Sequence, residues 1–140
     1  MPKTIDAVLV GAGRRAYYTF GRYAESHPDA LRYIAVAEPR EDARQRFARA
    51  HDIPDELCFQ SWEELMDRPQ LAQILVNTSS DSVHYSSTMA ALESGYDILL
   101  EKPMATTLAD TVRLVDTASR LGRSVWVCHT MRYSEFYNTV

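Results

Sequence analysis

Short apolar runs alternate with stretches of helical spacing along the chain, and the runs are continuous, apart from Gln73 in the fourth, rather than alternating between apolar and polar residues. The runs lie at 7–10, 33–37, 57–59, 71–76, 98–100 and 125–128. Continuous runs of this length are typical of strands buried on both faces. The pattern therefore predicts an α/β fold class, a doubly wound, mainly parallel sheet with helices on both faces.

The first run breaks at Gly11-Ala12-Gly13 and gives way to a stretch with helical spacing over 14–26. In such a turn Gly11 permits the tight bend, Gly13 lets the backbone approach a ligand, and Ala16 lets the helix pack closely on the strand. The helix N-terminus offers backbone N–H groups and a positive dipole end, which suit a pyrophosphate. Alone the motif is weak, because methyltransferases and ordinary turns share it.

The second run closes on Glu38. A carboxylate there, roughly 20 residues or more past the glycines, accepts hydrogen bonds from the adenosine ribose in dinucleotide-binding folds. Glycine turn, helix and carboxylate together predict a Rossmann-type dinucleotide-binding domain. Because a carboxylate repels a 2′-phosphate, NAD is the expected cofactor, while Arg14 and Arg40 leave NADP open.

The net charge of -4 leaves no basic stripe, so nucleic acid is not an expected partner. Arg40, Arg44, Arg46 and Arg49 alternate with polar and acidic residues, which predicts a solvated helix face. No stretch approaches the roughly 20 apolar residues of a membrane span. Two distant cysteines and no leader-like segment predict a reduced, cytoplasmic protein. The four histidines show no ligand spacing, so no metal is expected.

Capping residues mark the later helices. Thr107, with Asp110 three residues on, predicts a helix start, and the apolar positions Leu108, Val112, Val115 and Ala118 predict its buried stripe.

Several chemically active residues follow directly after predicted strands: Gly11, Glu38, Thr78, Glu101, Lys102 and His129. The carboxyl ends of parallel strands share one edge of the sheet, where ligands bind, so these residues are expected to gather there. Thr78 and Ser79 would supply backbone or hydroxyl contacts to the cofactor. His84, in the first turn of the next helix, would either face the nicotinamide or lie on the surface.

Glu101-Lys102-Pro103 after the fifth run, together with the glycine turn and the stretches 37–39, 77–84 and 89–95, resembles the Gfo/Idh/MocA family. The family's name joins glucose-fructose oxidoreductase, inositol dehydrogenase and rhizopine catabolism, and the resemblance covers essentially the whole chain. It implies an NAD(P)-dependent oxidoreductase that transfers hydride between nicotinamide and a secondary hydroxyl of a sugar, polyol or related compound. Lys102 is the implied catalytic residue, since an ammonium near the reacting carbon favours a developing alkoxide.

The residues expected to bind the cofactor are Gly11, Gly13, Arg14, Arg15, Glu38, Thr78, Ser79, His84, Glu101, Lys102 and Pro103. Glu101 would pair with Lys102 or with a backbone donor and so hold its loop. Pro103 would fix the loop's direction, with a cis bond open to it. His129 and Arg132 would reach a substrate pocket or make interdomain contacts.

Residues 1–128 are expected to form the dinucleotide-binding domain, and residues 129–140 to begin the crossover to a second, substrate-binding domain. The family's Asp-x-x-x-His pair in that domain does not occur in this sequence. We therefore expect an excised domain or a natural truncation that binds cofactor but turns over poorly. The alternative is a non-catalytic module that senses NAD(H). A methyltransferase is disfavoured because the Glu-Lys-Pro loop would then have no role. Substrate identity, stereochemistry and a homo-oligomeric state stay open.

Overall fold

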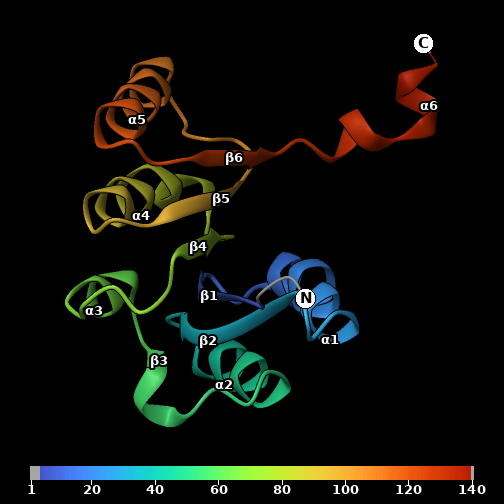
Figure 1. Ribbon diagram of the computed structural model, residues 1–140, viewed down its shortest axis with the longest axis vertical. Coiled ribbons are helices and arrows are strands. Elements are labelled where there is room, and N and C mark those ends of the chain that lie inside the picture. The colour runs from blue at the N-terminus through green and yellow to red at the C-terminus, as the bar shows by residue number, and fades with distance from the viewer. Residues whose placement is uncertain (1–3, 140) are drawn as a thin grey trace.

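The computed structural model of the protein describes residues 4–139 and folds around a six-stranded sheet (Figure 1). The strands are β1 (Ile5–Val10), β2 (Leu31–Ala37), β3 (Cys58–Phe59), β4 (Ile74–Asn77), β5 (Asp97–Glu101) and β6 (Val125–Cys128). They stand in the order β3-β2-β1-β4-β5-β6, and every neighbouring pair is parallel. This is the doubly wound Rossmann order, so the predicted fold class is confirmed. Residues 1–3 and 140 lie outside the described residues. They are the outer ends of the two predicted segments, 1–128 and 129–140.

Helices cover both faces of the sheet. On one face lie η1 (Ala16–Gly21), α1 (Arg22–Ser26) and α2 (Glu41–Ala50), over the β1–β2 half. The other face carries α3 (Trp62–Met66), α4 (Asp81–Glu93) and α5 (Leu108–Leu121). Two short 3-10 helices, η2 (Asp55–Leu57) and η3 (Thr130–Tyr133), and the short α-helix α6 (Glu135–Asn138) complete the elements of the described chain.

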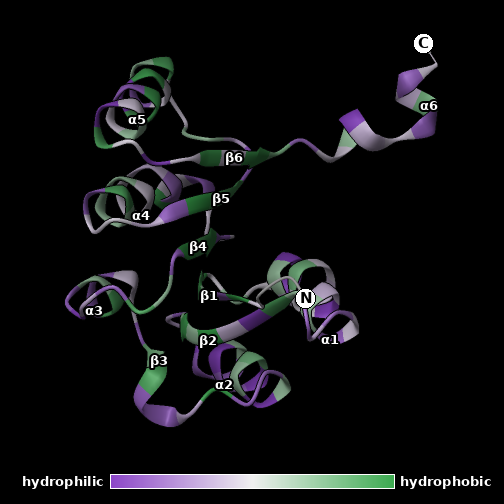
Figure 2. Cartoon of the chain, viewed as in Figure 1, coloured by the Kyte–Doolittle hydropathy of each residue, from purple (hydrophilic) through white to green (hydrophobic). Residues whose placement is uncertain are grey.

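Side chains of β1 divide the core into two layers. Val8 and Val10 point into the layer under α3, α4 and α5, whereas Ala7 and Leu9 point into the layer under η1, α1 and α2. All four are buried, as expected for a strand whose successive side chains face opposite sides of a covered sheet. Figure 2 shows hydrophobic residues concentrated in the strands, whereas the helices carry both hydrophobic and polar residues.

The predicted helix over 14–26 is confirmed, but it is not uniform. It begins at Arg14 and contains the π-helical segment η1 before the α-helical α1. A Cβ on Gly21 would lie 2.9 Å from Nε2 of His51 and 3.2 Å from Cε2 of Phe47. Helix α2 therefore packs directly against the backbone of η1, and a larger residue at Gly21 would push the two helices apart.

The predicted buried stripe of α5 is wrong at three of its four positions. Leu108, Val112 and Val115 are 79%, 48% and 53% exposed, and only Ala118 of that set is buried. The helix starts where predicted, with the Thr107 hydroxyl accepting from the Asp110 N–H at 3.1 Å. A second stripe, Leu114, Thr117 and Ala118, faces the core instead. Helical spacing fits either stripe, and contacts with α4 and the sheet choose between them.

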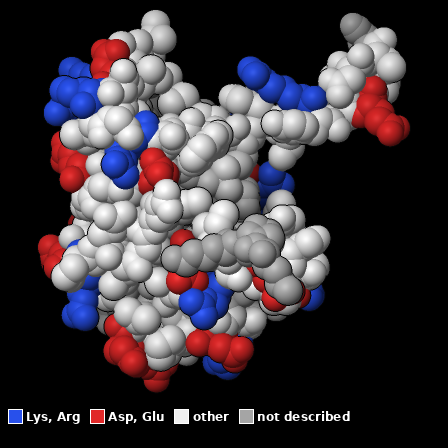
Figure 3. All heavy atoms as spheres, viewed as in Figure 1, with Lys and Arg blue, Asp and Glu red and all other residues white. Residues whose placement is uncertain are grey.

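Residues after β6 leave the body of the molecule. Segments η3 and α6 project beyond the sheet (Figures 1 and 3), and Met131, Tyr133 and Phe136 are 59%, 86% and 68% exposed. Figure 3 also shows basic and acidic side chains interspersed over the visible face. Within residues 4–139, no helix is long and apolar enough to cross a membrane.

Candidate functional site

Two adjoining cavities lie along the carboxyl edge of the sheet. The first, of about 510 Å³, has Gly11, Gly13, Glu38, Arg40 and Trp62 among its lining residues. The second, of about 370 Å³, is lined by Arg15, Asp81, His84, Glu101, Lys102 and Thr130. Thr78 and Ser79 line both cavities and mark the point where the two meet. The expected gathering of residues from separate strand ends is therefore present.

The glycine turn is held tightly against the loop that follows β4. Gly11 has a φ of +88°, and a Cβ there would lie 2.5 Å from both N and Cα of Ser79. Its N–H donates to the Ala37 carbonyl at 2.8 Å, and its carbonyl accepts from the Thr78 hydroxyl at 2.6 Å. Gly11 is thus required twice, by its backbone conformation and by the close approach of a second loop.

Glu38 lines the first cavity and is buried, with 4% of its surface exposed. It accepts hydrogen bonds from the Ala12 N–H at 2.8 Å, from the Arg40 N–H at 3.0 Å and from Nε of Arg40 at 2.8 Å. Burial by itself raises the pKa of the Glu38 carboxyl, but the donors from Arg40 and Ala12 outweigh it and leave the pKa below its ordinary value. The carboxylate is therefore charged, and it links the glycine turn to the end of β2.

Arg40 brings a cation to the same place. Its guanidinium spans both oxygens of Glu38 and would lie 3.5 Å from a Cβ on Gly13. Its side chain is 61% exposed, so solvent reaches the guanidinium beside the first cavity. The repulsion of a 2′-phosphate expected from Glu38 is therefore offset by a positive charge in direct contact with it.

The prediction of a solvated arginine face on α2 is wrong for Arg44. Only 8% of Arg44 is exposed, and its Nη1 donates to the backbone carbonyl of Glu38 at 2.6 Å. The guanidinium satisfies a carbonyl at the end of β2 and so fixes the backbone that carries the carboxylate. Nothing in the spacing of the arginines separates Arg44 from the exposed Arg49 or the half-buried Arg46, because the contact depends on how α2 lies against β2.

Asn77 organises the loop between the two cavities, although it is not among the predicted site residues. The side chain is fully buried and donates to the hydroxyls of Ser87 and Thr88 at 2.8 and 3.0 Å. Its Oδ1 accepts from the Ser79 N–H and hydroxyl at 3.2 and 2.7 Å. The hydroxyl hydrogens of Thr78 and Ser79 are both donated within the protein. The feature of the sequence that could have identified Asn77 is a polar residue at the end of a buried strand.

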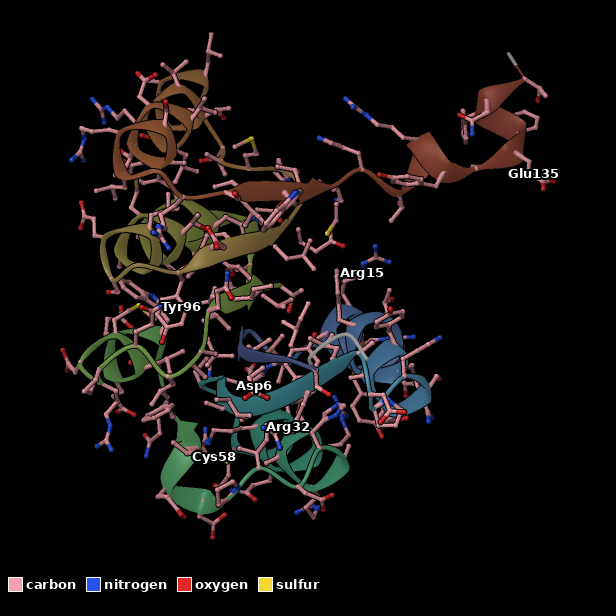
Figure 4. The ribbon with its side chains drawn as sticks, in the orientation of Figure 1. Asp6, Arg15, Arg32, Cys58, Tyr96 and Glu135 are labelled. Atoms are coloured by element: carbon pink, nitrogen blue, oxygen red, sulfur yellow. The ribbon has the colours of Figure 1, made fainter. Side chains whose placement is uncertain are left out.

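The second cavity is built around the end of β5. Glu101 pairs with the guanidinium of Arg15, whose side chain extends from the start of η1 toward the strand ends (Figure 4). The other carboxylate oxygen accepts from the Lys102 N–H at 3.0 Å. Of the two expected partners of Glu101, the backbone donor is confirmed, and Arg15 takes the place of the lysine ammonium. Lys102 itself is exposed, and the Lys102–Pro103 bond is cis.

His84 lies neither on the surface nor with a free ring nitrogen. It is 1% exposed, and its Nδ1 lies 2.7 Å from the Pro103 carbonyl oxygen, while Nε2 lies 3.1 Å from the Ser79 carbonyl oxygen. The surface alternative is therefore wrong. The ring connects the loop after β4 with the Lys102–Pro103 turn.

Other predicted residues lie elsewhere. Arg14 lines neither cavity, and its guanidinium carbon is 6.0 Å from the ring centroid of Tyr18. His129 and Arg132 line a separate groove of about 580 Å³ beside β6, which Arg15 also borders. Among the described residues, no group of His, Cys, Asp or Glu is arranged to hold a metal ion.

A glycine turn between β1 and a helix, a buried carboxylate at the end of β2 and a doubly wound parallel sheet together define a dinucleotide-binding Rossmann domain. Residues 5–129 match the model described as "Oxidoreductase family, NAD-binding Rossmann fold", GFO_IDH_MocA. The chain therefore belongs to the Gfo/Idh/MocA oxidoreductase family, and the resemblance found in the sequence is confirmed.

Individual relatives are dehydrogenases of greater length. The chain is 30% identical over 89 residues to a scyllo-inositol 2-dehydrogenase (NADP(+)) of Bacillus subtilis, covering 64% of this chain and 25% of that protein. It is 36% identical over 85 residues to an inositol 2-dehydrogenase of Agrobacterium fabrum, covering 60% and 25%. The chain thus spans about a quarter of the length of these curated relatives.

Solved structures share the fold. A dehydrogenase from Bordetella pertussis, solved with NADH and UDP-GlcNAcA, has a TM-score of 0.79 at 24% identity over 91% of this chain and 36% of that one. A 3-ketoreductase from Actinomadura kijaniata, solved with NADP, has a TM-score of 0.83 at 19% identity over 98% and 42%. Both nicotinamide cofactors therefore occur among proteins of this fold.

Proposed function

We propose that the chain binds a nicotinamide dinucleotide across the two cavities and forms the cofactor half of an oxidoreductase acting on sugar- or polyol-type compounds. One observation carries this proposal: the cavities meet at Thr78 and Ser79, with a buried carboxylate, Glu38, in the first and an exposed amine, Lys102, in the second. When bound, the nicotinamide supplies the site that accepts or gives the hydride.

The first cavity would hold the adenosine end. Glu38 has its charge fixed by Arg40 and Ala12, and it would share its oxygens between these donors and the ribose hydroxyls. Gly11 and Gly13 lack side chains, so a pyrophosphate could approach the backbone closely at the N-terminus of the helical stretch. Arg40 would accommodate a 2′-phosphate by turning away from Glu38. NAD is thus the expected cofactor, and NADP remains compatible with the site.

The second cavity would hold the reacting groups. The Lys102 ammonium would donate a hydrogen bond to the substrate oxygen and exchange a proton with it as the adjoining carbon changes oxidation state. Glu101 and Arg15 hold the backbone that carries the lysine, because the carboxylate accepts the Lys102 N–H while it pairs with the guanidinium. Their role is to position the amine.

Residues 129–140 would begin the crossover to a second, substrate-binding domain. Support comes from the exposed aromatic side chains of Tyr133, Phe136 and Tyr137, which lie outside either core. His129 and Arg132 border the groove beside β6, close to Arg15, so they would reach either a substrate or that second domain. The dehydrogenases of inositols among the relatives make cyclic polyols the first substrates to test.

The test is a titration with NADH, observed as energy transfer from tryptophan to the reduced nicotinamide. Trp62 lines the first cavity and Trp126 the groove beside β6, so both are suitable donors. Saturable transfer that weakens in Glu38→Ala, but not in the exposed control Glu93→Ala, would support the proposal. A folded protein without saturable NADH or NADPH binding would refute it. Binding without turnover of any polyol would favour a sensing module.

A further inference from the structure

Most polar side chains that line the second cavity are already hydrogen-bonded within the protein. The hydroxyls of Thr78 and Ser79 donate to protein acceptors at 2.6 and 2.7 Å. The ring nitrogens of His84 lie 2.7 and 3.1 Å from backbone carbonyl oxygens. Glu101 uses both carboxylate oxygens, one for the guanidinium of Arg15 and the other for the backbone N–H of the next residue. These side chains shape the cavity and leave little hydrogen-bonding capacity for a ligand.

Three other side chains that line the cavity, those of Asp81, Lys102 and Thr130, are exposed. Among residues 4–139, none of the three has a hydrogen-bond or ion-pair partner for its side chain. The Asp81 carboxylate accepts hydrogen bonds, the Lys102 ammonium donates them, and the Thr130 hydroxyl does both. The cavity therefore offers a ligand one unpaired carboxylate, from the first residue of α4, and one unpaired ammonium, from the end of β5.

The nicotinamide of the proposed cofactor carries groups that complement this pair. Its carboxamide ends in an NH₂ group with two donors. The proposed function assigns the Lys102 ammonium to the substrate oxygen, which leaves the Asp81 carboxylate to accept from the carboxamide. Hydrogen bonds of this kind, with an ionised acceptor, are stronger than those between neutral groups. The neutral hydroxyl of Thr130 can meet a carboxamide or a carboxylate equally well, so it adds no preference between them.

We propose that Asp81 is a specificity-determining residue, which accepts a hydrogen bond from the nicotinamide carboxamide and excludes dinucleotides that carry a carboxylate in its place. The inference rests on the proposed function, which places the nicotinamide in the second cavity. An acidic residue in the first turn of a helix also stabilises the helix dipole. That role changes the stability of the fold but not the choice between two dinucleotides that differ only at the carboxamide.

The test compares NAD with nicotinic acid adenine dinucleotide, in which a carboxylate replaces the carboxamide, by calorimetric titration of the 140-residue protein. The unsubstituted protein should bind the acid at least about tenfold more weakly, because the cavity loses a charge-assisted hydrogen bond and gains a repulsion between carboxylates. In Asp81→Asn the side-chain amide accepts from a carboxamide and donates to a carboxylate, so the two affinities should lie within about threefold.

Glu41→Gln is the matched control, because Glu41 is the exposed first residue of α2 and lines neither cavity. This variant should keep the preference for NAD. ADP-ribose, which lacks the nicotinamide, should bind the unsubstituted protein and Asp81→Asn equally. A gain in ADP-ribose affinity as large as the gain for the acid would reduce Asp81 to a general repulsion of anions and overturn the inference.

Two further outcomes separate this inference from the proposed function. A preference for NAD that is absent, or that Asp81→Asn leaves unchanged, would overturn the role of Asp81 while NAD binding itself still supports the proposed function. A preference for the acid would show that the carboxamide position faces Lys102 instead. A folded protein that binds neither dinucleotide nor ADP-ribose would refute the proposed function and this inference with it.

Discussion

The two cavities at the carboxyl edge of the sheet are built in different ways. The first is formed by a glycine turn pressed against a neighbouring loop and by a buried carboxylate whose oxygens accept backbone and arginine donors. The second is formed by side chains, with the ion pair of Arg15 and Glu101, the buried ring of His84 and the exposed Lys102. Thr78 and Ser79 are common to both.

On the proposed function, this difference separates binding of the cofactor from chemistry on the substrate. A site defined by backbone approach and a fixed charge is preorganised and sets affinity, because little has to be ordered when a ligand enters. A site that presents an exposed amine on a supported turn can exchange a proton, and its effect is seen in rate rather than affinity. Substitutions in the two cavities should therefore change different measurements.

The largest effect is expected from Lys102→Met. In the enzyme that this chain would form together with the expected substrate-binding domain, removal of the amine should lower the rate of polyol oxidation by about 100-fold to 10,000-fold, the usual range for an acid–base group, and change the NADH dissociation constant by less than about twofold. Initial rates with inositols and an NADH titration measure the two quantities. Lys102→Arg is the control, because it retains the charge but does not release a proton. Equal loss of affinity and rate would remove the distinction between the cavities.

Gly11→Ala comes next and acts on the first cavity. The added Cβ would meet N and Cα of Ser79 at 2.5 Å in a backbone with a φ of +88°. We expect a loss of about 2–4 kcal/mol in the free energy of unfolding, together with loss of NADH binding.

Gly122→Ala provides the matched control for that substitution. Gly122 also has a positive φ, +62°, but nothing lies within 4 Å of its Cβ position. It should cost only about 1 kcal/mol, the price of the left-handed conformation, and leave NADH binding intact. Urea unfolding of both variants checks this, and equal losses would show that the approach of the Ser79 loop contributes nothing.

Glu38→Gln should change the choice of cofactor. Loss of the carboxylate removes an acceptor for the ribose hydroxyls and releases Arg40, so NADH should bind about tenfold more weakly and NADPH more tightly. Titrations with the two cofactors measure the ratio, and Arg40→Gln should shift it in the opposite direction. A ratio unaffected by either substitution would place the adenosine ribose elsewhere.

The smallest expected effect is on stability against pH. Because the folded-state pKa of Glu38 lies below its ordinary value, the carboxylate stabilises the fold above the unfolded-state pKa of about 4.3, and this stabilisation is lost as the pH falls through the folded-state pKa. Unfolding free energies of the unsubstituted protein and Glu38→Gln should therefore approach each other as the pH falls below the unfolded-state pKa, and converge once it lies below the folded-state pKa. Curves that remain parallel down to the acid limit would show that the Glu38 pairing is energetically neutral.

Most of the fold was predictable from local pattern. Strands β4, β5 and β6 each begin and end within three residues of their predicted bounds. The glycine turn, Glu38 and the Glu-Lys-Pro motif all lie at the ends of strands, as expected. The buried face of α5 was not predictable, because Leu108 and Leu114 each belong to a stripe with helical spacing. The burial of Arg44 was not predictable either, because Arg44 differs from Arg46 and Arg49 only in its contact with the backbone carbonyl of Glu38.

The sequence by itself determined the order of strands and helices along the chain, the need for glycine at the first turn and the membership of the family. All three depend on residues that are close together along the chain. Tertiary structure alone decided the partners of the site: Gly11 against Ser79, Arg15 with Glu101, and His84 between Ser79 and Pro103. Except for the contact between His84 and Ser79, which both follow β4, each of these contacts joins parts of the chain at the ends of different strands. Burial and hydrogen-bond partners depend on packing in three dimensions, and local spacing carries no information about which distant segment will lie there.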